Sequence, residues 1–194
     1  MNDGDLRERR RDSTRREISR VAIDLVLDRG LGEVTVDDIA EAAGVSPRTF
    51  FNYFPSKKAA LMPGPDPLAV ANVQRFAAAR DVPVIDGLKA LLTEHATVSP
   101  DIRDNVRAAH ELLTRYPELA PTLHESIAGF EASIVDAVAQ RLDAPDGDPR
   151  ARVAAAMCSC VLKIAVMSHT HESTDSLERD ISNAFDAMRE LLTI

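Results

Sequence analysis

Apolar residues recur along most of this chain at the spacing of an α-helix. The first set lies at positions i, i+3, i+4 and i+7: Ile18, Val21, Ala22 and Leu25. Such a stripe is one face of an amphipathic helix, which we expect to start at Ser13 or Thr14 and to end at Gly30. No alternating strand pattern and no internal repeat occurs, so the sequence predicts an all-α protein.

Proline and glycine residues divide the remainder of the chain into further helices. Ser56 is placed to cap a short fourth helix, which ends at Pro63 because proline lacks an amide donor and restricts the residue before it. Further helices are expected at residues 68–80, 84–97, 101–115, 122–142 and 151–167, with a last one that carries Leu177, Ile181, Phe185, Met188 and Leu192. We place the domain boundary just after the fourth helix, giving domains of residues 12–72 and 73–194.

Residues 35–54 predict two short helices joined by a tight turn. Thr35 is a good N-cap, with Asp38 at the third helical position of a capping box. Gly44 follows where a residue in the left-handed conformation ends the first helix. A second helix therefore begins within a few residues.

Ser46 is a suitable N-cap for this second helix, and Pro47 suits its first position because the missing N–H would have had no partner there. Phe50 and Phe54 are i, i+4 neighbours that can pack inward. The other faces then carry side chains suited to base edges and phosphates: Arg48, Thr49, Asn52 and Tyr53.

This passage, TVDDIAEAAGVSPRTFFNYF followed by Ser56 and Lys57, resembles the helix-turn-helix of the tetracycline-repressor (TetR) family of bacterial transcription regulators. The resemblance covers roughly residues 12–72. It implies a three-helix DNA-binding head followed by a helical ligand-binding and dimerisation body. The DNA contacts it implies, with Arg48 and Asn52 nearest the bases, are Thr35, Ser46, Pro47, Arg48, Thr49, Phe51, Asn52, Tyr53 and Lys57.

The net charge of -8 is distributed unevenly. Residues 1–62 hold 11 Lys and Arg against 11 Asp and Glu, so the acidic excess belongs to the rest of the chain. Seven of the first twenty residues are arginines. This arm can lie along phosphates or enter a minor groove, or it can be a frayed, solvated terminus. Arg15 and Arg16, nearest the first helix, are the candidate phosphate contacts.

Residues 151–167 are apolar at nearly every position, so we expect a helix covered on two sides. One side would line the core or a pocket and the other would pack on a second subunit, and the alternative is the central helix of a monomeric bundle. Two-fold symmetry is what a palindrome-reading helix-turn-helix protein needs, which favours a homodimer. The expected dimer interface comprises Val161, Ile181, Phe185 and Met188.

An effector pocket is expected in the body, lined by His95, His110, Phe130, Met157 and Lys163. Lys163 is the one charge after Arg152 within residues 151–167, where an anionic ligand would compensate a buried ammonium. Its alternative is to extend to the surface or to pair with a carboxylate, and ordinary packing is the alternative for His95, His110 and Phe130.

Several other classes of site and location are not favoured. His169, His171, Glu172 and Asp175 resemble a metal cluster, but His at i, i+2 diverge on a helix, so a solvated turn and no metal are expected. No catalytic motif or cofactor motif is present. Cys158 and Cys160 are expected to be reduced thiols. With no signal peptide and no apolar run near about 18 residues, we expect a cytoplasmic protein without a membrane partner.

These observations predict a DNA-binding transcriptional regulator rather than an enzyme. We expect a repressor that binds a palindromic operator in double-stranded DNA as a homodimer and is released by an unidentified small-molecule effector. The alternatives are a helical interaction protein without operator specificity, and a ligand-independent or activating regulator.

Overall fold

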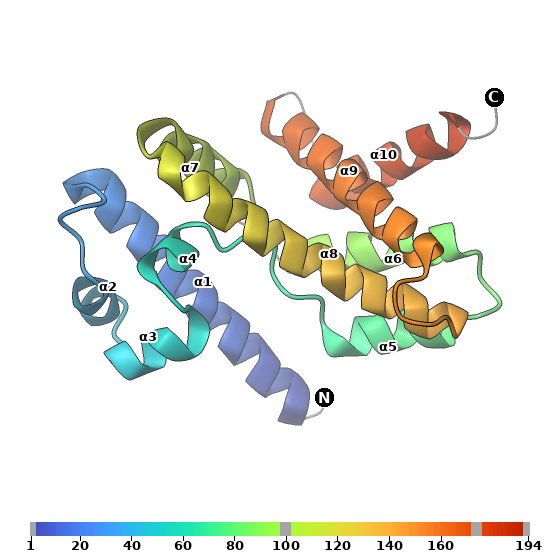
Figure 1. Ribbon diagram of the computed structural model, residues 1–194, viewed down its shortest axis with the longest axis horizontal. Coiled ribbons are helices and arrows are strands. Elements are labelled where there is room, and N and C mark those ends of the chain that lie inside the picture. The colour runs from blue at the N-terminus through green and yellow to red at the C-terminus, as the bar shows by residue number, and fades with distance from the viewer. Residues whose placement is uncertain (1–2, 98–101, 172–175, 192–194) are drawn as a thin grey trace. The chain divides into compact units, whose positions relative to one another are not determined.

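The computed structural model describes residues 3–97, 102–171 and 176–191 (Figure 1). No strand occurs in these ranges, so the predicted all-α class is confirmed. The elements are α1 (Asp3–Arg29), α2 (Val36–Ala42), α3 (Pro47–Tyr53), α4 (Lys57–Leu61), α5 (Val70–Ala78), α6 (Val84–Thr97), α7 (Ile102–Arg115), the 3-10 helix η1 (Pro117–Leu119), α8 (Ala120–Leu142), α9 (Pro149–His171) and α10 (Leu177–Leu191).

The chain divides into two compact units. The head unit is Met1–Asp66 together with Ala108–Ile127, and the body unit is Pro67–Arg107 together with Ala128–Ile194. The sequence suggested a boundary after residue 72 and gave no sign that a later segment joins the head. Residues Ala108–Ile127 belong there because Leu112 and Leu119 are fully buried in the same core as α1 to α4.

The head unit forms around the apolar stripe of α1. Ile18, Ala22 and Val26 are fully buried, together with Ile39 of α2 and Phe50 of α3. Burial of such side chains is the main source of stability in a small helical unit. Of the predicted stripe, Ile18, Val21 and Ala22 are buried and Leu25 is half-buried against the same core, so the stripe is confirmed.

The start of α1 differs from the prediction. The helix begins at Asp3 and runs through Ser13 and Thr14, the residues expected to cap it. Thr14 Oγ1 instead donates to the carbonyl of Arg10 at 2.9 Å, which is how threonine is accommodated inside a helix. The arginine-rich arm is thus helical where its backbone is described.

Of two breaks predicted at prolines, the structure contradicts one and confirms the other. Pro121 was expected to precede a helix, but α8 begins at Ala120 and includes it. Proline is tolerated there because amides in the first turn have no intrahelical partner. At the other break α4 does end at Leu61, as predicted, and Gly64 follows with φ of +66°.

The turn after α4 is held against the start of α8. Ser126 Oγ donates to the carbonyl of Met62 at 2.8 Å. A Cβ atom on Gly64 would lie 2.6 Å from the Cβ of Ser126, closer than real Cβ atoms approach other atoms. Glycine is therefore required at position 64 both by its backbone conformation and by this contact.

The body unit has its own core, built from α5, α6, α9, α10 and the later part of α8. Arg141 of α8 is buried in it, and its guanidinium donates to the carbonyls of Phe76, Ala79 and Val82 at 2.9, 2.6 and 2.5 Å. The same group lies 4.6 Å from the centre of the Phe76 ring. A buried charge is tolerated because several acceptors surround it. Arg141 thereby holds the segment between α5 and α6.

Helix α9 corrects one expectation about membranes. Within the described residues, Pro149–Ser168 is long and apolar enough to span a bilayer by length and composition, with a mean hydropathy of 1.6. The sequence was expected to hold no such segment. One such helix is weak evidence for a span, because the core helix of a soluble protein passes the same test. Cys158, Val161 and Ala165 of α9 do lie in the body core.

The four candidate metal ligands named in the sequence analysis have no described side chains. The side chains of His169 and His171, and the whole of Glu172 and Asp175, lie outside the described residues.

Candidate nucleic-acid interface and apolar pocket

The start of α2 is fixed by a reciprocal cap. Thr35 Oγ1 accepts from the amide of Asp38 at 3.1 Å, and Asp38 Oδ2 accepts from the amide of Thr35 at 2.7 Å. This is the predicted capping box. Hydrogen bonds from the hydroxyl and the amide of Thr35 lower the pKa of the Asp38 carboxyl, so the cap is charged near neutral pH.

The turn between α2 and α3 and the start of α3 also follow local rules. Gly44 has φ of +65°, and the amide of Val45 donates to the carbonyl of Ala40 at 2.9 Å. Ser46 Oγ accepts from the amide of Thr49 at 3.0 Å, and Pro47 is the first residue of α3. The direction of α3 is thus set by residues on both sides of the turn.

The exposed face of α3 carries the side chains expected to read DNA. Phe50 is fully buried, whereas Pro47, Arg48, Phe51 and Asn52 are exposed. These four positions have the spacing i, i+1, i+4 and i+5 and share one face of the helix. Thr49 and Tyr53 are half-buried at its margins.

Phe51 is the most unusual member of this face, since 56% of it is exposed. Its ring meets that of Phe50 edge to face, with the centroids 5.5 Å apart and the planes at 87°. Such a contact is a preferred aromatic geometry. The buried Phe50 therefore orients an exposed apolar ring on α3.

The cations predicted to contact phosphates are held inside the head unit. Lys57 is half-buried, and its Nζ donates to the carbonyls of Leu31 and Val34 at 2.5 and 2.6 Å. Arg15 donates to Asp66 Oδ1 at 3.1 Å and to the carbonyl of Pro63 at 2.9 Å.

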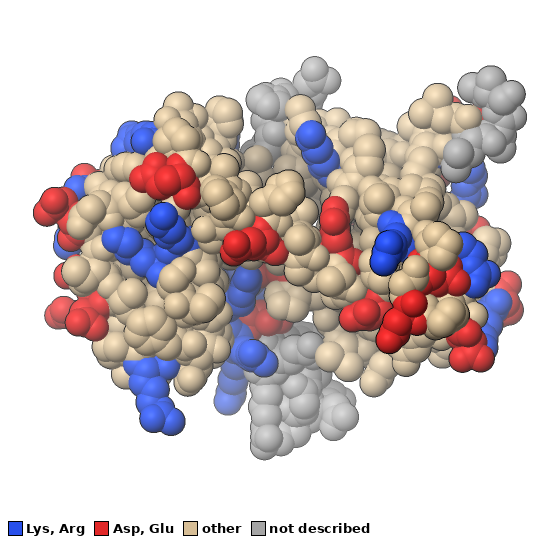
Figure 2. Space-filling model, in the orientation of Figure 1, with Lys and Arg blue, Asp and Glu red and all other residues tan. Residues whose placement is uncertain are grey.

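Arg16 shares the same acidic partner, with its Nε 3.6 Å from Asp66 Oδ2. The guanidinium of Arg15 also lies 5.1 Å from the centre of the Phe54 ring. Burial lowers the pKa of Arg15 and Asp66 opposes this shift, but an arginine stays charged near neutral pH. Figure 2 shows basic and acidic side chains of the described residues mixed on the visible face.

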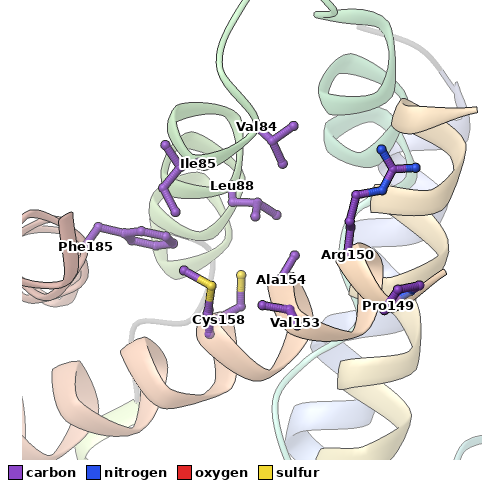
Figure 3. Close-up of a pocket in the computed structure, with 10 residues that line it drawn as sticks. Val84, Ile85, Leu88, Pro149, Arg150, Val153, Ala154, Cys158 and Phe185 are labelled. Atoms are coloured by element: carbon purple, nitrogen blue, oxygen red, sulfur yellow. The ribbon is translucent and has the colours of Figure 1, made fainter. Parts of the chain in front are cut away.

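A cavity of about 380 Å³ lies in the body unit between α6, α9 and α10 (Figure 3). Figure 3 shows Leu88, Phe185 and Cys158 approaching one another from these three helices. Burial raises the pKa of the Cys158 thiol to about 12, so the thiol stays neutral there. The lining residues are Val84, Ile85, Leu88, Pro149, Arg150, Val153, Ala154, Met157, Cys158 and Phe185.

Arg150 is the charged residue of this lining. Its side chain is exposed, and its Nη2 lies 2.8 Å from Asp148 Oδ2. The cavity is otherwise apolar. A ligand that is mainly hydrocarbon would fit it, with any polar group directed to the rim at Arg150.

The predicted pocket residues are not brought together. Met157 lines the cavity, whereas His95 and Phe130 are buried in the body core with their rings 5.4 Å apart. His110 is exposed in the head unit, and Lys163 is exposed on α9. The apolar residues Val84, Ile85 and Val153 were missed, because a lining of aliphatic side chains has the same sequence signal as a core.

The residues predicted for the dimer interface are mostly covered within the chain itself. Val161, Ile181 and Phe185 are buried in the body core, and Met188 is half-buried against it. The exposed apolar side chains of α9 lie elsewhere, at Val153, Ile164 and Met167, each more than half exposed. Together with the exposed Cys160, they have spacings of 7, 4 and 3 and form one stripe, the α9 face.

Sequence comparisons decide the family. A family model of bacterial regulatory proteins of the tetR family matches residues 18–61, and the MftR C-terminal domain matches residues 82–193, more than half of the chain. This chain belongs to the TetR family. The resemblance seen in residues 35–57 is therefore confirmed.

Relatives of this TetR-family protein agree over different lengths. It is 31% identical over 93% of its length to a Mycobacterium tuberculosis protein described as a mycofactocin biosynthesis transcriptional regulator, MftR, of which the match covers 91%. The transcriptional regulator TcmR of Streptomyces glaucescens is 47% identical over 27% of this chain and 24% of its own. A tetR-family regulator structure from Streptomyces coelicolor overlaps 93% of this chain and 82% of its own, with 22% identity and a TM-score of 0.48.

This TetR-family chain is thus a DNA-binding transcriptional regulator and not an enzyme, as predicted. Regulators of the family bind DNA and act as dimers with small-molecule effectors. Soluble members of the family are typically cytoplasmic.

Proposed function

We propose that this protein represses transcription by binding a palindromic operator as a homodimer, and that a small apolar molecule in the body-unit cavity releases it. The observation that carries the proposal is the exposed face of α3. Arg48 and Asn52 stand on that face beside the exposed ring of Phe51. Arg48 and Asn52 are exposed, so packing of the head core does not account for them, and Phe51 stays more than half exposed despite its edge contact with Phe50.

Each group on this surface has a matching partner in DNA. Arg48 can donate two hydrogen bonds to a guanine edge, Asn52 can pair with adenine, and the Phe51 ring can contact a thymine methyl group. Ser46, Thr49 and Tyr53 lie at the start and the margins of α3, where hydroxyls suit phosphate oxygens. The hydroxyl of Thr35 already donates to Asp38 Oδ2, so Thr35 is not included. Pro47 keeps the first turn of α3 rigid. Arg15, Arg16 and Lys57 are left out of this set because of their internal contacts.

A second copy of the chain is the partner proposed for the α9 face. A palindromic site requires two heads related by two-fold symmetry. The stripe Val153, Cys160, Ile164 and Met167 exposes apolar area that a second copy of the same stripe can cover. In solution Ile164→Glu should lower the mass seen by sedimentation without unfolding the chain, and a monomeric wild-type protein would contradict this part.

The cavity supports release by an apolar effector. Its volume of about 380 Å³ lies within the range of sites for small molecules. An effector acts only as far as it binds the DNA-incompetent state more tightly, and a 100-fold loss of operator affinity needs about 2.7 kcal/mol of such coupling. Hydrophobic acids and their thioesters can be titrated against the DNA complex, and a compound that binds free and DNA-bound protein equally well would contradict release.

The proposed recognition of DNA bases by α3 is tested on two duplexes of the same length. One is selected by the purified protein from a randomised library, and the other has a random sequence. Arg48→Ala should weaken binding to the selected duplex by about 1–3 kcal/mol and hardly affect the random one. Arg20→Ala is the matched control, because Arg20 is an exposed head arginine paired with Glu17 and Asp24 on α1. Equal losses on both duplexes would show that Arg48 does not read bases.

A further inference from the structure

The backbone of Leu31 is held from two sides by side chains that come from distant parts of the sequence. Its amide donates to Tyr116 Oη at 3.2 Å, and its carbonyl accepts from Lys57 Nζ at 2.5 Å. The same ammonium also bonds the carbonyl of Val34 at 2.6 Å. Three polar groups of one short turn therefore depend on two side chains.

This turn has little regular structure of its own. It follows α1 at Gly30, whose φ is +101°, and leads directly to Thr35, the cap of α2. Backbone groups that are partly withdrawn from water need partners, and here Lys57 and Tyr116 supply them. The position of α2, and through it of α3, depends on how this turn is held.

A neighbouring contact supports the same arrangement. Arg115 Nη1 donates to the carbonyl of Leu27 at 3.0 Å, in the last turn of α1 where carbonyls lack intrahelical partners. Leu112 and Leu119, on either side of Tyr116, are fully buried in the head core. These buried neighbours hold Tyr116 against the head core, where its hydroxyl accepts from the amide of Leu31.

We infer that Lys57 and Tyr116 are positioning residues for DNA binding, which hold the Gly30–Val34 turn so that α2 and α3 meet DNA in the correct place. Lys57 acts through this turn and not as a phosphate contact. Two of the three protons of its ammonium are already donated to carbonyls. The inference rests on the proposed function, because it concerns the same DNA-binding surface.

Salt dependence separates positioning from phosphate contact. Losing one phosphate contact flattens the plot of log affinity against log salt by about 0.9, whereas a misplaced turn weakens binding without that signature. Affinities of wild type, Lys57→Met, Tyr116→Phe and the double variant are measured for the selected duplex across a range of salt. Lys58→Met is the matched control, since it removes the same charge from the exposed neighbouring residue.

We expect Lys57→Met to weaken binding by about tenfold or more and Tyr116→Phe by up to about tenfold, because bonds to charged donors are the stronger ones. The plot of log affinity against log salt should be at least as steep for Lys57→Met as for Lys58→Met. The fold-loss of DNA affinity in the double variant should be smaller than the product of the fold-losses in the two single variants, because both side chains hold the same residue, Leu31.

Two results would overturn the inference: a salt slope flattened by about 0.9 in Lys57→Met beyond the control, or independent effects of the two substitutions in the double variant. Tyr116→Phe removes only a hydroxyl, so it tests the inference even if Lys57→Met does not fold. A wild-type protein that shows no preference for the selected duplex would instead overturn the proposed function, and the inference with it.

Discussion

Helices α3 and α9 each expose one face, for which we propose DNA binding and self-association respectively, and the two faces are determined in different ways. In α3 the cap at Ser46, the proline at position 47 and the inward Phe50 leave one face for Arg48, Phe51 and Asn52. In α9 apolar residues occupy nearly every side, so the order of residues does not say which side is covered. That choice is made by packing in the body core, where α10 contacts α9: Cys158 and Val161 are buried there and Ile164 is left exposed.

In the head unit the local sequence indicates which apolar residues are buried, whereas in the body unit only the packing of the helices does. In the head unit an exposed phenylalanine stands next to a buried one, and local helix geometry already separates them. In the body unit Phe185 and Ile164 are equally apolar, yet one is a core residue that lines a cavity and the other is exposed. Substitutions in matched pairs can break or sharpen this contrast.

The largest expected effect separates two phenylalanines. Phe185→Ala should cost about 3–5 kcal/mol of the free energy of unfolding, because Phe185 is 1% exposed in the body core. Phe51→Ala should change stability by no more than about 0.5 kcal/mol while weakening DNA binding. Urea unfolding followed by circular dichroism measures both. If Phe185→Ala folded with nearly wild-type stability, the placement of that ring in the core would be wrong.

A smaller difference is expected between two glycines of the head unit. Gly44 and Gly64 have nearly the same φ, +65° and +66°, but only Gly64 has Ser126 within contact of a new Cβ. Gly44→Ala should therefore cost about 1–2 kcal/mol from the left-handed backbone alone. Gly64→Ala should lower the free energy of unfolding by about 1–3 kcal/mol more than Gly44→Ala, since its new methyl group would also clash with Ser126. Equal midpoints of denaturant unfolding would argue against a close approach of α8 to this turn.

The smallest effect distinguishes the two cysteines of α9 and depends on pH. The raised pKa of Cys158, about 12, means that folding favours its neutral thiol. Its contribution to stability is complete below the ordinary thiol pKa of 9.0 and is lost as the pH rises from there toward 12.

Near pH 8, iodoacetamide should therefore modify the exposed Cys160 of the native protein and reach Cys158 only in denaturant. Mass spectrometry of the digested protein locates the label, and Cys160→Ser provides the control with a single thiol. Rapid labelling of Cys158 in the native state would show that the cavity wall is open to water.

The sequence by itself determined those features that depend on neighbouring residues. The caps at Thr35 and Ser46, the glycine at position 44 and the end of α4 each follow from side chains within a few positions. These short-range rules were sufficient to predict an all-α protein and to reveal the TetR-family head. They failed at the start of α1, which continues through the two expected capping residues, Ser13 and Thr14.

Only the tertiary structure decided which contacts form between distant segments. Leu31 and Tyr116 are 85 positions apart, and nothing local indicates that one hydroxyl meets that one amide. Arg15 and Lys57 are cations of the kind that contact phosphates, yet in the structure they bond carbonyls and a carboxylate of their own unit. The cavity and the α9 face likewise depend on how α6, α9 and α10 pack, because burial is a property of the assembled helices and not of any one sequence pattern.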